Sequence, residues 1–95
     1  MDDKNTALVD AIARCALKDQ ASLKFLFSQV GGYLNGVAYR LLKDDDLANE
    51  VLQEAFLQIW QNAHTYRPDT SKPLTWMTSI VRYPPPAPTD KKNPT

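Results

Sequence analysis

Residues 44–63 constrain the fold of this chain more than any other segment. Apolar side chains recur there every three or four positions, which places them on one face of an α-helix. A helix face that is acidic and amide-rich is either simply solvated or docks on a basic partner, and that choice decides the function. The face opposite the apolar stripe has no basic residue and consists of Asn49, Glu50, Gln53, Glu54, Gln58 and Gln61.

The same pattern predicts where this helix starts and what it buries. Asp45 or Asp46 is expected to cap it, because a side-chain oxygen there can accept hydrogen bonds from the free amides of the first turn. Glu50, Gln53 and Glu54 are expected to be exposed. The predicted buried set is Val51, Leu52, Ala55, Phe56 and Ile59.

Two helices are predicted before this segment. The first spans about residues 6–18, with Asn5 or Thr6 as its cap and an inward stripe of Leu8, Val9, Ile12, Ala13, Ala16 and Leu17. The second spans about residues 21–42 and contains Gly31-Gly32, which favours a close helix contact or a local bend there. Its inward residues are predicted to be Leu23, Leu26, Phe27, Val30, Leu34, Val37, Ala38, Leu41 and Leu42.

A short helix is predicted to start at Pro73, since proline is favoured at the first helical position. Its inward residues are Trp76, Met77, Ile80 and Val81. No segment alternates as a strand would. The fold is therefore predicted to be all-α, a compact bundle of three longer helices and one short C-terminal helix over residues 1–83. Residues 84–95 hold five of the seven prolines and are expected to form a disordered tail.

Composition excludes several classes of protein. Eleven acidic and eleven basic residues give a net charge of zero, whereas a domain that holds DNA by phosphate neutralisation alone should be basic. The single cysteine, Cys15, excludes an internal disulfide and is expected to be small apolar filler. No apolar run is long enough to span a membrane and no signal peptide is recognisable, so the expected compartment is the cytoplasm.

A search for catalytic chemistry finds none. No glycine-rich phosphate loop is present, and a lone histidine in a polar loop, His64, is usually a surface residue. Asp44, Asp45 and Asp46 lack the spacing of a calcium loop and are better explained by helix capping. No enzyme, metal or cofactor is predicted. Trp60 and Trp76 are expected in the core. Tyr66 either anchors its loop or stacks on an unpaired base, and the structural role is favoured.

Two segments together resemble a known family. The run DLANEVLQEAFLQIW over residues 46–60 is similar to the polymerase-binding helix of bacterial extracytoplasmic-function sigma factors. The run PLTWMTSIVR over residues 73–82, preceded by Tyr66, resembles the segment that follows it in that family. Residues 25–42 resemble the family's first long helix, so the similarity covers about residues 21–82.

The resemblance implies a sigma domain of the second conserved region, which clamps onto a coiled coil of the largest subunit of core RNA polymerase. It also implies capture of flipped bases of the promoter minus-ten element, and a possible anti-sigma partner. Polymerase-facing positions match Glu50, Gln53 and Glu54. In the loop expected to hold a base, the matching candidates are Asn62, His64, Tyr66, Arg67 and Lys72. On the helix expected to face DNA they are Thr75, Thr78, Ser79 and Arg82.

The chain also departs from the family pattern. An arginine-rich turn is expected after Arg82, but Tyr83-Pro84-Pro85-Pro86 stands there, and no helix-turn-helix domain follows. The expectation is a truncated sigma factor with weak promoter binding. The alternative is a protein-binding module that holds polymerase or an anti-sigma partner without productive promoter recognition. An unrelated helical domain with a chance match is the least favoured non-enzymatic interpretation.

Overall fold

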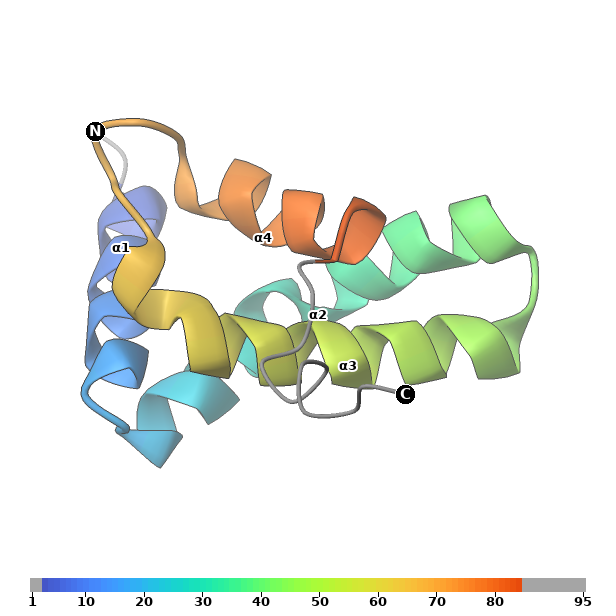
Figure 1. Cartoon of the computed structure of the whole chain (residues 1–95), viewed down its shortest axis with the longest axis horizontal. Helices are drawn as coiled ribbons and strands as arrows, with labels where there is room; N and C mark the ends of the chain where they lie inside the picture. The colour runs from blue at the N-terminus through green and yellow to red at the C-terminus, as the bar shows by residue number, and fades with distance from the viewer. Residues whose placement is uncertain (1–2, 85–95) are drawn as a thin grey trace, which may run out of the picture.

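A computed structural model describes residues 3–84, and within that range the chain is helical with no strands. The elements are α1 (Asp3–Ala16), α2 (Gln20–Leu42), α3 (Asp45–Asn62), the short 3-10 helix η1 (Ala63–Thr65) and α4 (Pro73–Arg82). This arrangement confirms the predicted all-α class and the short helix beginning at Pro73 (Figure 1). The expected proline-rich tail lies outside the described residues beyond Pro84.

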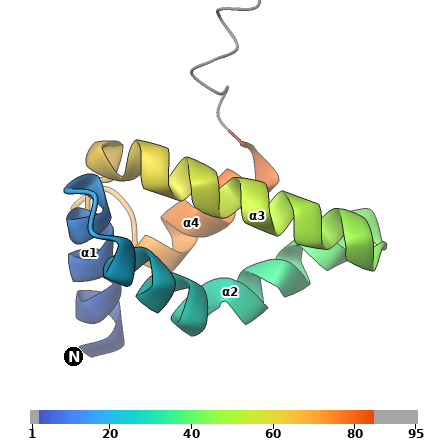
Figure 2. The ribbon, with the colours of Figure 1, turned by 90° about the horizontal axis from the view of Figure 1, so that it is seen from below.

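The two long helices, α2 and α3, form an antiparallel hairpin that is the body of the molecule (Figure 1). The other two helices cover it. Helix α4 packs against both long helices, and α1 closes one end by contacting α2, α3, α4 and η1 (Figure 2). Because η1 contacts both α1 and α3, the start of the loop between α3 and α4 is held at the end that α1 closes.

Aspartates start the two long helices. Asp44 Oδ1 accepts a hydrogen bond from the Leu47 amide at 3.0 Å, so Asp44 caps α3, and the prediction of Asp45 or Asp46 was wrong. Those two carboxylates lie in the first turn, where the positive end of the helix dipole favours them. Asp19 caps α2 in the same way, accepting from the Ala21 amide at 3.2 Å.

Helix α1 differs most from its prediction. It begins at Asp3, so Asn5 and Thr6 lie inside its first turns and are not its caps. Ala13 is exposed and Leu17 is 80% exposed, while Val9 and Ala16 are half-buried. The buried set is Leu8, Ala11, Ile12 and Cys15, whose spacing of three, four and seven follows a single helix face.

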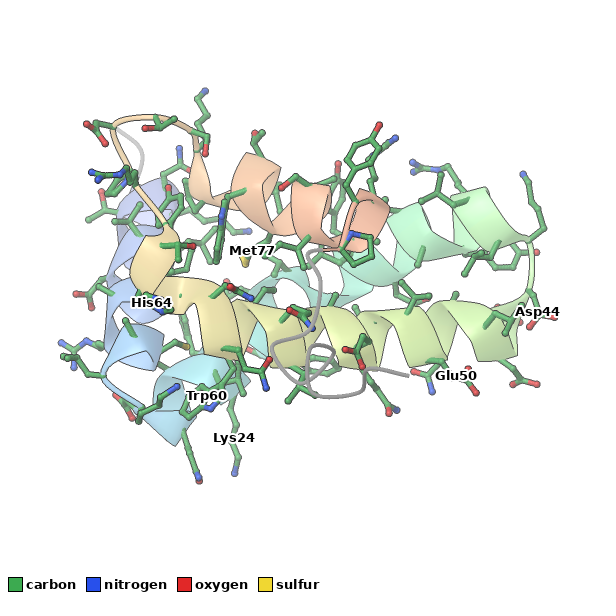
Figure 3. All side chains as sticks on the ribbon, in the orientation of Figure 1. Lys24, Asp44, Glu50, Trp60, His64 and Met77 are labelled. Atoms are coloured by element: carbon green, nitrogen blue, oxygen red, sulfur yellow. The ribbon has the colours of Figure 1, made fainter. Side chains whose placement is uncertain are left out.

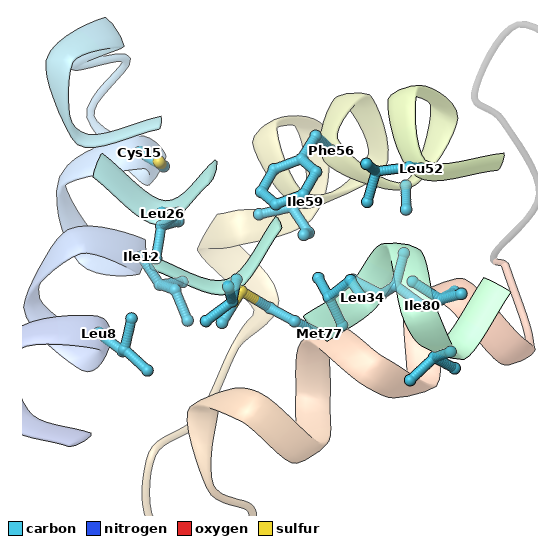
Figure 4. Close-up of a cluster of buried hydrophobic side chains, with 14 of the residues drawn as sticks. Leu8, Ile12, Cys15, Leu26, Leu34, Leu52, Phe56, Ile59, Met77 and Ile80 are labelled. Atoms are coloured by element: carbon cyan, nitrogen blue, oxygen red, sulfur yellow. The ribbon is translucent and has the colours of Figure 1, made fainter. Parts of the chain in front are cut away.

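One continuous core joins all four helices (Figure 4). Ile12, Leu26, Leu34, Ile59 and Met77 are each inaccessible to solvent. Cys15 is also fully buried, as predicted for small filler, and burial raises the pKa of its thiol. Part of the α2 prediction fails, because Phe27, Leu41 and Leu42 are exposed. The last two lie at the tip of the hairpin, where neither α1 nor α4 covers them (Figure 1).

The two glycines of α2 do not break the helix, which continues from Gln20 to Leu42. The predicted close contact with another helix is not found, because the nearest side chain at Gly31 belongs to α2 itself. A Cβ atom at position 31 would lie 3.3 Å from the ring of Phe27, one turn earlier, whereas position 32 faces open space. The Phe27 ring therefore lies over Gly31, and it packs edge-on against Phe56 with 5.2 Å between ring centroids.

Candidate functional site

The outer face of α3 presents the three side chains predicted to bind polymerase. Glu50, Gln53 and Glu54 are all exposed, and Glu50 projects away from the hairpin (Figure 3). On the opposite side Leu52, Ala55, Phe56 and Ile59 are buried as predicted, but Val51 is only half-buried. Helix α3 thus has one exposed polar face and one buried apolar face, and the three candidates lie together on the polar face.

This surface contains an apolar groove that the sequence did not reveal. The groove, of about 530 Å³, lies between α2 and α3 and is lined by Leu23, Phe27, Glu50, Gln53, Glu54, Phe56 and Leu57. Phe27 is 51% exposed and Leu57 is 48% exposed, so both of these large apolar side chains are accessible in the groove. Acidic and amide groups therefore border an accessible apolar strip.

The burial of Gln58 is the main difference from the polar face predicted for α3. It is 2% exposed, and its side chain links two neighbours on the same helix. Its Nε2 donates to Glu54 Oε2 at 3.2 Å, and its Oε1 accepts from Asn62 Nδ2 at 3.1 Å. Residues 54, 58 and 62 are four apart, the spacing that brings helical side chains together, so the sequence held a signal for this ladder.

The loop candidates do not form one site. Asn62 is half-buried at the end of α3, whereas His64, Arg67 and Lys72 are exposed. Asn62 lines a groove of about 220 Å³ with Thr65, Trp76, Ser79, Ile80 and Tyr83. The groove brings Asn62 and Ser79 together from different helices. The three charged or titratable loop residues do not line it.

Tyr66 anchors the loop to the core. Its hydroxyl donates to the Ser71 carbonyl oxygen at 2.8 Å, and its ring lies 5.0 Å from that of Trp76. Burial raises the pKa of the Tyr66 hydroxyl. The structural role favoured for this residue is therefore confirmed. Trp60 and Trp76 pack against the core but remain half-buried, and the Lys18 ammonium lies 5.1 Å from the Trp60 ring centroid.

The α4 candidates gather on the side of that helix that faces α2. A second groove, of about 320 Å³, is lined by Tyr33, Leu74, Thr75, Thr78, Ser79, Arg82 and Tyr83. Arg82 is the one cation among these side chains. All four α4 candidates therefore share one surface. Three of these side chains carry a hydroxyl group and one carries a charge.

Two further observations concern residues 3–84 as a whole. No helix among them is long and apolar enough to cross a bilayer. No group of three or more histidine, cysteine, aspartate or glutamate side chains in this range is arranged to hold a metal ion.

Comparison with known proteins identifies relatives. The sequence is 30% identical over 77 residues to the ECF RNA polymerase sigma factor SigK of Mycolicibacterium vanbaalenii, covering 80% of this chain and 39% of that protein. It is 26% identical over 70 residues to the ECF RNA polymerase sigma factor SigK of Mycobacterium tuberculosis, covering 74% of this chain and 37% of that protein. The chain thus spans about two fifths of the length of these relatives.

No solved structure gives a significant match. The model of the sigma-70 region 2 family matches residues 26–83, from α2 to the end of α4. The match includes the α3 face, the loop and α4, so it covers every candidate site residue. Because it extends over more than half of the chain, the chain belongs to the sigma-70 region 2 family.

Proposed function

We propose that this chain acts in transcription initiation, by binding core RNA polymerase through the outer face of α3 and contacting the promoter minus-ten element through the loop and α4. The observation that carries the polymerase part is the exposure of Glu50, Gln53 and Glu54 on one face of α3, a helix that contains no basic residue. Carboxylates and amides accept charge-assisted hydrogen bonds from arginine, which makes a basic helical partner their natural complement.

The apolar groove supports the same assignment. Stable interfaces combine an apolar centre with a polar rim, and truncation of a few central side chains removes most of the binding energy. Phe27 and Leu57 supply accessible apolar area beside Glu54. The partner surface expected here is a segment of the largest polymerase subunit that offers an apolar side chain flanked by arginines.

The polymerase contact is tested by alanine substitution on α3. Gln53→Ala with Glu54→Ala is expected to raise the Kd for core RNA polymerase at least about tenfold, since one truncated contact of this kind costs 1.4 kcal/mol or more. Because Glu54 also accepts from Gln58, Glu50→Ala with Gln53→Ala is measured beside it. Gln29→Ala, at an exposed position of α2 that does not line the groove, is the control. Unchanged affinity in both double variants would contradict the proposal.

The DNA contact is proposed to be weak. The net charge is zero and Arg82 is the one cation in the α4 groove, so few phosphates can be neutralised. The small number of cations favours a second candidate function. In it, the chain is a module that binds polymerase or an anti-sigma protein without productive promoter recognition. A promoter-opening assay with core polymerase separates the two, because only the first candidate melts the minus-ten element.

A further inference from the structure

We infer that Gly31 is a positioning residue for polymerase binding, because it makes room for the ring of Phe27, and that this ring determines the shape of the docking groove. The groove is the one of about 530 Å³ between α2 and α3, beside Glu54. The role rests on the proposed polymerase contact and deepens it, since it names the side chain that shapes the docking surface and the backbone position that supports it.

Phe27 is the accessible side chain that two neighbouring grooves share. The groove of about 530 Å³ and a second groove of about 240 Å³ have three lining residues in common, Leu23, Phe27 and Phe56. Phe56 is buried and Leu23 is half-buried, whereas Phe27 is 51% exposed. A partner that fills either groove therefore contacts Phe27, and a shift of this ring changes the shape of both grooves.

Two contacts fix where the Phe27 ring lies. A Cβ atom at position 31 would lie 3.3 Å from two atoms of this ring and 3.5 Å from a third, so the ring occupies the space that any larger residue there would need. On α3, Phe56 packs edge-on against the same ring, with 5.2 Å between centroids. The ring therefore rests on the α2 backbone and against a buried side chain of α3.

The surroundings of Gly31 distinguish it from the other glycines of α2. Gly31 is buried, and the three atoms nearest to an added Cβ all belong to Phe27. At Gly32 and Gly36 an added Cβ meets nothing within 4 Å. Glycine weakens a helix interior relative to alanine. Position 31 is therefore the one of the three at which packing requires a glycine.

The occupant of the groove is the segment of the largest polymerase subunit proposed above, and charge complementarity supports it. Glu50 and Glu54 line the groove and α3 contains no basic residue, so the rim accepts hydrogen bonds from arginine. The centre of an interface is packed as densely as a protein interior. Displacing the Phe27 ring by a few tenths of an ångström therefore loses contacts with the partner, although no residue of the rim has changed.

Alanine at positions 31 and 32 tests this role. Gly32→Ala is expected to raise the melting temperature by about 4–8 °C and to keep the parent's Kd for core RNA polymerase. Gly31→Ala is expected to melt no lower than the parent, since a half-exposed ring can yield towards solvent, and to raise the Kd about three- to tenfold. Fluorescence anisotropy of the full chain, labelled on its N-terminal amine, measures binding, and circular dichroism measures melting.

A double-mutant cycle shows whether position 31 acts through the ring. Alanine at position 27 has no atoms beyond Cβ, so nothing is left for a new Cβ at position 31 to displace. Phe27→Ala is expected to raise the Kd at least about tenfold, as truncation of a central apolar side chain does. In that background, adding Gly31→Ala is expected to leave the Kd unchanged, because the two residues are coupled.

The outcomes separate the positioning role from polymerase binding itself. Equal Kd values for Gly31→Ala and Gly32→Ala refute the role and leave the polymerase proposal intact. The role is also refuted if the loss at position 31 persists beside Phe27→Ala, if Phe27→Ala binds like the parent, or if Gly31→Ala melts below the parent, because the ring then does not yield. Failure of the parent chain to bind polymerase removes both proposals.

Discussion

At the scale of single residues, Tyr66 is a side chain proposed for DNA contact that also makes contacts within the folded protein. Its hydroxyl donates a hydrogen bond to Ser71 and its ring packs against Trp76, so the hydroxyl and part of the ring are used inside the protein. The composition of the loop left the two roles open, because an aromatic residue serves either equally well. Only the position of Ser71 five residues later settles where the hydroxyl goes.

Tyr66→Phe is expected to lower the free energy of unfolding by about 1 kcal/mol, because it removes one partly buried hydrogen bond. Urea unfolding followed by circular dichroism measures this.

Burial raises the pKa of the Tyr66 hydroxyl, so the folded state holds this proton more tightly than the unfolded state does. The stabilisation is therefore complete below the ordinary tyrosine pKa of about 10 and is lost as the pH rises beyond it. The Tyr66→Phe variant should show less of this alkaline loss than the parent.

Trp76→Ala is expected to cost about 2–3 kcal/mol, less than the 3–5 kcal/mol typical of a fully buried tryptophan, because the ring is half-buried. The same urea titration measures it. A variant that melts like the parent but binds single strands more weakly would show that the indole contacts bases and contributes little to packing.

At the scale of helices, the sequence predicted which elements form better than it predicted where they begin. The apolar period identified all four helices, and Pro73 marked the start of α4 because proline fits the first helical position. Three consecutive aspartates before α3 could not be ranked by pattern, since each is a good cap. Backbone geometry makes the choice: Asp44 is extended, with φ −149°, while the next two residues are helical.

Asp44→Ala is therefore expected to destabilise the protein by about 1 kcal/mol, through loss of the cap bond to Leu47. Asp45→Ala is the control, with an expected cost of about 0.3–1 kcal/mol at low salt that falls as salt screens the dipole interaction. Thermal melting at two salt concentrations distinguishes them. A larger loss in the control would mean that charge, and not the cap bond, secures the start of α3.

The buried face of α1 and the burial of Gln58 were not predicted, for two different physical reasons. Two apolar stripes overlap on α1, and only contact with α2, η1 and α4 decides which one turns inward. On α3, glutamine is usually a surface residue, so Gln58 was grouped with its exposed neighbours. Its burial depends on carboxylate and amide partners one turn to either side, a relation that composition does not express.

At the scale of the whole molecule, balanced charge sets the expected salt response. With eleven bases against eleven acids, single-strand binding should lose less affinity between 50 and 200 mM salt than the about 10³–10⁵-fold loss of a protein with 6–10 phosphate contacts. Anisotropy titrations at those two concentrations test this expectation. A loss within that range would show that more cations than the exposed Arg67, Lys72 and Arg82 contact the DNA backbone.

The burial of Cys15 gives the molecule a built-in reporter of its own opening. This thiol is the only one in the chain, is fully buried in α1, and lies outside the segment that matches the family. A thiol reagent can reach it only after α1 detaches or the domain unfolds, so the modification rate measures the free energy of that opening. If α1 detaches alone, modification will be faster than global unfolding allows. The ratio of the two rates then gives the strength with which the α2–α3 hairpin holds α1.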